Sequence, residues 1–143
     1  MLDNQAITEL TNEDKARLAK QRKVIERFLG DEQSLRNYET VAGKLGLLQA
    51  ILDQHVFHLN QKFEWQCTGV VLGDALVQEL GMQWIMVEGS SGRGPALSLA
   101  DTTIVLYPLT MISKHIEKGQ MVDVFDLFNN VAAEVGRMRV AGC

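Results

Sequence analysis

The sequence predicts an α+β fold in a single domain, residues 1–143, with a helical N-terminal half, a three-stranded antiparallel meander packed against a central helix, and two C-terminal helices. The first observation is a change of apolar period at Gly81, from helical steps of three and four to short runs rich in β-forming residues. The second is that these runs are joined by short connections, whereas parallel strands need a crossover of about a dozen residues. Because three strands cannot bury themselves, helices must cover one face of the sheet.

The first predicted helix covers residues 12–29 and is amphipathic. Thr11 and Asp14 have the spacing of a capping box at its start, and Gly30 is a natural stop at its end. Lys and Arg side chains occupy its outer side, but acidic residues are interleaved with them and no set of aromatic residues accompanies them. This pattern indicates a solvated helix face and argues against a nucleic-acid partner.

The second predicted helix covers residues 44–62 and carries the most regular apolar stripe in the chain. Gly43 and Gly46 interrupt the pattern, and each glycine costs about 1 kcal/mol relative to alanine inside a helix. We therefore expect a looser or broken segment before Lys44. Residues 1–40 are expected to form a helical N-terminal extension.

The third predicted helix covers residues 65–80 and is apolar on more than one side, which predicts that it is the central, most buried helix. Gly69 and Gly73 lie one turn apart on one face of it. In a soluble protein this spacing indicates that another backbone approaches closely. Both glycines are therefore assigned a structural role.

The second half of the chain is predicted to hold the sheet and two further helices. The strands lie within residues 82–107, at 84–87, 96–99 and 103–107. Residues 89–94 are expected to form a flexible turn, and Pro108 ends the last strand. Trp84 and Pro108 are also assigned structural roles. The two C-terminal helices are expected at residues 109–118 and 123–137.

The composition narrows the class of protein. A net charge of −4 and a hydrophobic fraction of 46% are typical of a soluble globular chain and do not favour nucleic acid as a partner. The longest apolar runs are too short to cross a membrane, and the charged first thirty residues lack the apolar core of a signal peptide. Two cysteines, Cys67 and Cys143, do not make a disulfide framework. The chain is therefore expected to be cytoplasmic.

Four stretches from Trp65 onward form a recognisable pattern: Trp65-Gln66-Cys67-x-Gly69-x-x-x-Gly73-Asp74-Ala75-Leu76, Trp84-x-x-Val87-Glu88, Gly92-Arg93 with Pro95-Ala96-Leu97, and Tyr107-Pro108-Leu109-Thr110-Met111-Ile112-Ser113-Lys114. In their order and spacing they resemble a bacterial domain family of unknown function, DUF3806, over roughly residues 45 to 130. The resemblance implies an α+β domain in a bacterial cytosolic protein. It implies no activity, and residues 1–40 lie outside it.

Three candidates for catalytic or metal chemistry have simpler explanations. His55 and His58 lie three residues apart, but no third ligand is marked by spacing, so no metal is expected. The 89–94 segment lacks the lysine of a phosphate-binding loop and leads into a strand, so no nucleotide cofactor is expected. Cys67 lies between apolar helical positions, where cysteine is usually a small buried hydrophobe and not a nucleophile. We expect no cofactor and favour a protein that is not an enzyme.

A polar cluster is the remaining candidate site. Asp74 lies on a largely apolar helix, where a carboxylate must find a partner or be partly exposed. Arg93, Lys114 or a backbone donor at a helix start could supply that partner, and Arg93 could also pair with Glu88. Such a cluster either ties the helix to the sheet or binds a polar ligand, and the structural role is the more common. Gln66 and Trp84 belong to the same group of candidates.

Two functions are consistent with these observations. The first is a non-catalytic protein–protein interaction or regulatory module, whose partner is an unidentified protein or a second copy in a homodimer. The alternative is a small-molecule or peptide binding domain, or an unrecognised enzyme, that uses Asp74, Glu88 and Arg93. Convergence of these three side chains in a pocket would favour the alternative, whereas an exposed apolar patch would favour the first.

Overall fold

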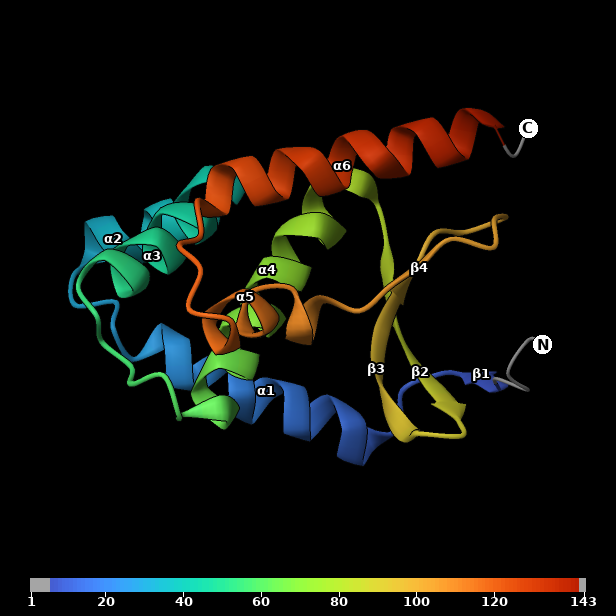
Figure 1. The fold of residues 1–143 in the computed structure, drawn as a ribbon, viewed down its shortest axis with the longest axis horizontal. Coiled ribbons are helices and arrows are strands. Elements are labelled where there is room, and N and C mark those ends of the chain that lie inside the picture. Colours follow the sequence, from blue (N-terminus) through green and yellow to red (C-terminus); the bar gives the residue numbers. More distant parts are fainter. Residues whose placement is uncertain (1–5, 142–143) are drawn as a thin grey trace.

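The structure is a computed structural model that describes residues 6–141, and it has the predicted α+β architecture. Figure 1 shows the sheet at one end of the molecule and the helices filling the rest. The elements follow one another as β1 (Ala6–Thr8), α1 (Asn12–Glu26), α2 (Glu32–Tyr38), α3 (Val41–Asp53), α4 (Lys62–Leu80), β2 (Gln83–Gly89), β3 (Gly92–Ser98), β4 (Val105–Leu106), the 3-10 helix η1 (Pro108–Thr110), α5 (Ser113–Glu117) and α6 (Val124–Ala141).

The described sheet has four antiparallel strands in the order β1-β2-β3-β4, one more than the sequence predicted. The meander of β2, β3 and β4 was predicted, whereas β1 was not. This strand is three residues long and all three residues are exposed, so it carries no alternating apolar pattern. It pairs with the end of β2, where Ile7 lies opposite Val87.

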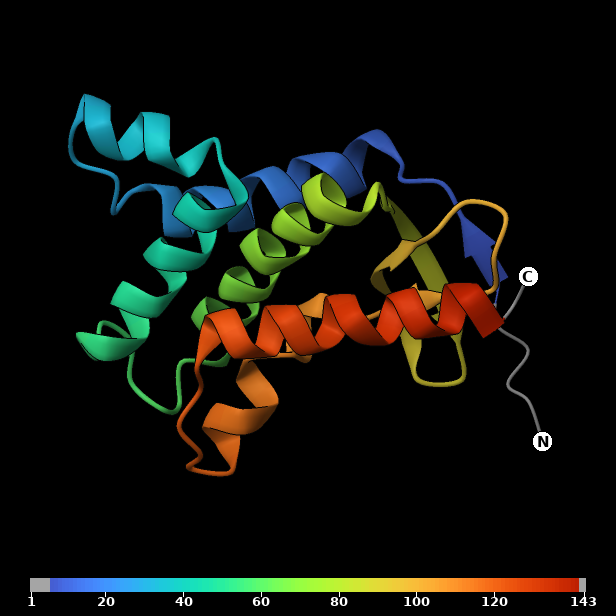
Figure 2. The ribbon, with the colours of Figure 1, turned by 90° about the horizontal axis from the view of Figure 1, so that it is seen from above.

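Helix α4 is the central helix, as predicted. Figures 1 and 2 show it between α1 on one side and α6 on the other. An added Cβ at Gly69 would lie 2.4 Å from the carbonyl oxygen of Pro108, and one at Gly73 would lie 2.5 Å from the Trp84 ring. The predicted close approach therefore exists: η1 packs against Gly69, and the first part of β2 packs against Gly73.

The prediction of one helix at residues 44–62 was wrong at both ends. The segment before Lys44 is not loose, because Thr40 caps α3 and the helix begins at Val41. Gly43 permits this arrangement, since an added Cβ would lie 1.6 Å from the carbonyl oxygen of Asn37 in the preceding helix α2. At the other end α3 stops at Asp53, and His55 adopts a left-handed φ of 51°.

Other boundaries differ by a few residues. The first helix ends at Glu26 and not at residue 29, and α4 begins three residues earlier than predicted. The expected flexible turn at 89–94 is largely strand, because the β2–β3 hairpin turns at Ser90 and Ser91 alone. Arg93 is therefore a strand residue, not a loop residue. The segment predicted as one helix at 109–118 is divided between η1 and α5.

One main core holds the helices and the sheet together. It joins residues of α1, α3, α4, α5 and α6 with the inner ends of the strands, including Ile25, Leu48, Leu72, Leu97 and Val135. A smaller cluster of Ile85, Val87 and Ala96 lies within the β2–β3 hairpin. Among residues 6–141, no helix has both the length and the apolar character needed to cross a membrane.

Candidate functional site

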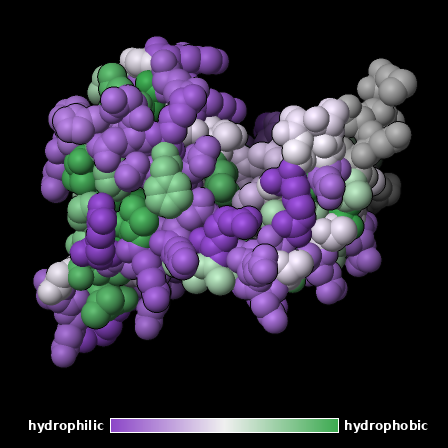
Figure 3. Space-filling view, turned by 90° about the horizontal axis from the view of Figure 1, so that it is seen from below, coloured by the Kyte–Doolittle hydropathy of each residue, from purple (hydrophilic) through white to green (hydrophobic). Residues whose placement is uncertain are grey.

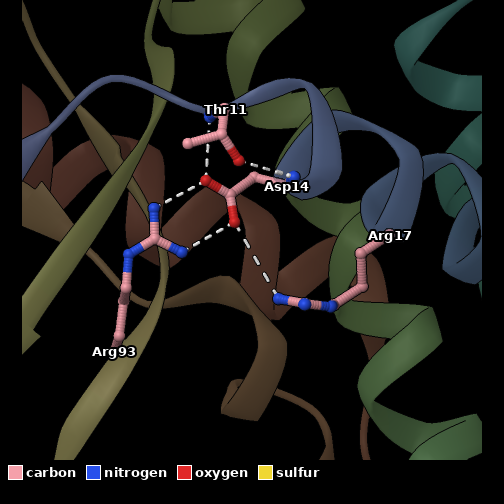
Figure 4. Close-up of polar contacts among 4 residues, drawn as sticks. All are labelled: Thr11, Asp14, Arg17 and Arg93. Atoms are coloured by element: carbon pink, nitrogen blue, oxygen red, sulfur yellow. Dashed lines mark hydrogen bonds and ion pairs between the residues drawn. The ribbon is translucent and has the colours of Figure 1, made fainter.

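Asp14 and Arg93 join the start of α1 to β3 (Figure 4). The Arg93 guanidinium donates two hydrogen bonds, from Nη1 to Asp14 Oδ1 at 2.7 Å and from Nη2 to Oδ2 at 2.6 Å. Asp14 also accepts from the backbone nitrogen of Thr11, whose hydroxyl in turn accepts from Asp14 N, so the predicted capping box is present. Asp14 is 3% exposed. The hydrogen bonds from Arg93 and Thr11 hold the pKa of Asp14 well below its ordinary value of 3.8.

A second ion pair joins the middle of α1 to α4. Arg22 donates from Nε to Asp74 Oδ2 at 2.5 Å and from Nη2 to Oδ1 at 2.9 Å, and the Trp84 indole donates to Oδ1 at 3.1 Å. The hydrogen bond to Asp74 raises the pKa of Arg22. Beside this pair, Lys44 donates to the carbonyl of Tyr38 and lies over its ring. Burial lowers the pKa of Lys44 and raises that of Tyr38.

The predicted cluster is thus divided between two places. Asp74 is paired with Arg22, and Arg93 is paired with Asp14, so the expected contact between Asp74 and Arg93 is replaced by two contacts to α1. Glu88 lies directly opposite Arg93 in the β2–β3 register and is exposed. Lys114 is exposed in α5 and forms no hydrogen bond or ion pair with any residue in the described part of the chain.

Within the described residues, the histidines and Cys67 have no arrangement suited to metal binding. His55 and His58 lie in the segment between α3 and α4, not on a shared helix face. Within residues 6–141, no group of three or more His, Cys, Asp or Glu side chains is placed to hold a metal ion. Cys67 is fully buried in α4, and burial raises the pKa of its thiol to about 11. Cys143 lies outside the described residues.

A cavity that the sequence did not predict lies between the α3–α4 segment and the α5–α6 segment, and we call it the apolar pocket. Its volume is about 380 Å³, and it is lined by Leu52, Asp53, His55, Phe57, Leu59, Trp65, Ile116, Gly119, Gln120, Met121 and Val122. Phe57 and Trp65 are buried and meet edge to face, with ring centroids 5.5 Å apart. Leu59 and Met121 are exposed. The pocket therefore joins a buried aromatic wall to exposed aliphatic side chains.

A second concavity lies beside the β2–β3 hairpin, and we call it the hairpin hollow. Its volume is about 640 Å³, and it is lined by Gln66, Val87, Gly89, Ser91, Gly92, Arg93, Gly94, Pro95, Tyr107, Leu109 and Thr110. The hollow is more polar than the apolar pocket, because three hydroxyl groups and one amide line it. Of the predicted polar residues, Arg93 and Gln66 line it, but Asp74, Glu88 and Lys114 do not.

Residues 44–128, more than half of the chain, match the family described as Domain of unknown function (DUF3806). The chain belongs to this family. Most residues that line the hairpin hollow come from the stretches that carry the resemblance, whereas Asp14 and Arg22 lie outside the DUF3806 match. No curated protein matches the chain at a significant level.

A similar fold occurs in a crystal structure from Bacteroides thetaiotaomicron VPI-5482. The alignment covers 90% of this chain with a TM-score of 0.72 and 16% sequence identity. The chain spans about half of the length of that structure, since 47% of the other chain is covered. At this identity the likeness shows the fold alone.

Sequence reasoning missed Asp14 and Arg22 as partners of the predicted residues. The sequence already explained Asp14 as part of a helix capping box, and it placed Arg22 among the basic residues of a predicted solvent-exposed helix face. The signal was indirect: a carboxylate on an apolar helix must find a partner or be partly exposed, but nothing in the sequence specifies which partner.

Proposed function

We propose that the protein is a non-catalytic interaction module that binds a partner protein through the apolar pocket. The observation that carries this proposal is the exposure of aliphatic side chains at a preformed apolar cavity: Met121 is 99% exposed and Leu59 is 67% exposed. Single exposed hydrophobic residues are ordinary, but exposed ones at the mouth of an apolar cavity are typical of binding surfaces. Methionine suits such a surface because its flexible thioether adapts to different partners.

The surface near the pocket extends this apolar character. Phe28, two residues after the end of α1, meets the ring of Phe57 at a centroid distance of 5.9 Å and is itself partly exposed. Phe63, in the first turn of α4, is 51% exposed. Figure 3 shows hydrophobic side chains gathered over the end of the molecule away from the sheet. Aromatic residues and methionine are enriched in the cores of protein interfaces.

The polar groups of the pocket favour one kind of partner segment. Asp53 lines the cavity and is exposed, and its Oδ1 accepts a hydrogen bond from Gln49. Asp53 is the only carboxylate among the residues that line this cavity within the described chain. The occupant that complements the pocket is therefore an apolar side chain of the partner, followed or preceded by a lysine or arginine that pairs with Asp53.

Two features support a role without catalysis. Asp74 and Arg93, the strongest candidates for acid–base or anion chemistry, are each held in an ion pair with α1. The Cys67 thiol is inaccessible, and its raised pKa disfavours the reactive thiolate. We also propose a bacterial cytoplasmic location, supported by a composition with only two cysteines, which indicates a reducing compartment.

The test is site-specific photocrosslinking in native cells, with a benzophenone amino acid at Leu59 and a matched probe at Val140. Val140 is 78% exposed on α6 and does not line the pocket. We expect an adduct with one protein from position 59 that the control position does not give. Binding of that purified protein should weaken at least ten-fold in Met121→Asp and several-fold in Asp53→Asn, with folding unchanged. Equal adducts from both positions, or binding insensitive to both substitutions, would contradict the proposal.

A further inference from the structure

Gly94 lies inside strand β3, where no neighbouring part of the fold requires a glycine. It lies in β3 opposite Val87, and it does not adopt a left-handed φ. An added Cβ at this position would meet nothing within 4 Å. Gly69 and Gly73, by contrast, admit neighbouring elements of the fold. Since a glycine weakens a strand, one that faces open space is typical of a place where something outside the fold approaches closely.

The space that Gly94 leaves open is the hairpin hollow. Three glycines of the hairpin line it, Gly89, Gly92 and Gly94, so the backbone is accessible there. The opposite side is supplied by other elements, with Tyr107 and Thr110 following β4 and Gln66 on α4. A volume of about 640 Å³ lies within the usual range of small-molecule sites.

The electrostatics of the hollow favour an uncharged ligand. Arg93 is the only charged residue that lines it among the described residues. Both terminal nitrogens of Arg93 are bound by Asp14, so the positive charge is balanced within the protein. An anionic ligand would have to compete with this two-point contact.

The remaining polar groups can both donate and accept hydrogen bonds. They are the hydroxyls of Ser91, Tyr107 and Thr110 and the amide of Gln66, although the Thr110 hydroxyl already donates to the Tyr107 carbonyl oxygen at 3.4 Å and is left as an acceptor. Tyr107 is 44% exposed, so its ring offers an apolar face beside these groups. A ligand that matches this set carries several hydroxyl or amide groups and one apolar face.

We infer that the hairpin hollow is a binding site for a neutral sugar, either free or as a unit of a longer glycan. The ring of a pyranose fits the observations because its hydroxyls lie at the rim and its C–H face is apolar. Addition of a partner strand at this edge is opposed by Pro95, which has no N–H to donate. In the described sheet, β4 pairs with Leu97 and Ser98 of β3, so the part of β3 before Leu97 has no strand beside it on that edge.

The experiment is an NMR titration of the ¹⁵N-labelled full chain with N-acetylglucosamine, its β-1,4-linked trimer and glucuronate. We expect saturable shifts of the Gly92, Gly94 and Tyr107 amides with N-acetylglucosamine and at least three-fold weaker binding of glucuronate. Gly94→Val should abolish these shifts while the unfolding temperature stays the same or rises, because valine favours a strand and its Cβ meets no neighbour within 4 Å. Gly136→Val, which also adds a side chain into open space, should bind like the parent.

The trimer distinguishes the two sources of the sugar. If the trimer binds at least ten-fold more tightly than the monosaccharide, the natural ligand is a glycan chain. If the two bind equally, the natural ligand is a free sugar. Tighter binding of glucuronate than of the neutral sugar, shifts retained in Gly94→Val, or no shift with any of the three probes would overturn the inference.

Discussion

Replacement of Asp74 by alanine should destabilise the protein by about 1–3 kcal/mol. The substitution removes two hydrogen bonds from Arg22 and one from Trp84. Breaking a fully buried ion pair costs about 3–5 kcal/mol, and an exposed pair contributes about 0–1 kcal/mol. This pair lies between those limits, because the side chains of Arg22 and Asp74 are 29% and 16% exposed and water can solvate part of what is left unpaired. At about 4 °C per kcal/mol for a chain of this size, the unfolding temperature should fall by roughly 4–12 °C.

Differential scanning calorimetry of three variants tests this reasoning. Asp74→Asn keeps an acceptor for the Trp84 indole but loses the charge, so its unfolding temperature should lie between those of Asp74→Ala and the parent. Glu32→Ala, which removes the carboxylate of the exposed Arg36–Glu32 pair, should change the stability by less than about 1 kcal/mol. An unchanged or raised unfolding temperature of Asp74→Ala would refute a structural role of the pair and give the ligand-binding hypothesis for Asp74 first place.

Three other predictions concern packing, pH and assembly. Gly69→Leu and Gly73→Leu should each lower the stability by about 1–3 kcal/mol or more in urea titrations, because even a Cβ would overlap Pro108 or Trp84, whereas Gly136→Leu should not. The pKa of Asp14 is lower in the folded state than in the unfolded state. The stability that its carboxylate contributes is therefore present above the unfolded pKa and is lost as the pH falls below about 4. In that pH range, the urea midpoint of Asp14→Asn should depend less on pH than the midpoint of the parent. Self-association into a homodimer is expected to double the mass of 15.9 kDa in sedimentation equilibrium at micromolar protein, and the monomer mass would exclude it.

The sequence predicted the elements whose apolar pattern matches their burial. Helix α4 and strand β2 fall into this class, since α4 holds a buried run from Cys67 to Gly73 and the middle of β2, Ile85 to Val87, is buried. The elements it missed are short and exposed. Strand β1 has no buried residue and α2 has none either, so neither leaves a periodic signal. The end of α3 was missed because apolar residues continue at helical spacing past Asp53, at Val56, Leu59 and Phe63.

The candidate site was predicted less well, because partners distant in sequence are not encoded locally. That Asp74 needs a partner or partial exposure followed from its apolar surroundings, but Arg22 is 52 positions away and Asp14 is 79 positions from Arg93. The two concavities were not predicted for a related reason. The apolar pocket is made by two connecting segments, between α3 and α4 and between α5 and α6, and a linear sequence does not indicate that these lie side by side.

The two ion pairs also bear on how the region before residue 44 relates to the rest of the domain. Each pair joins α1, which lies outside the family match, to a residue within it. The same helix places Leu18 and Ile25 in buried positions, so it contributes apolar contacts as well as charges. Without α1, Asp74 would be left in partly apolar surroundings without its cation, and a part of the α4 surface would be uncovered. The sequence predicts α1 to be part of a solvated extension, but this helix is a structural part of the domain. Its basic outer face is exposed, whereas Arg22 and the capping Asp14, on other faces, hold it to α4 and β3.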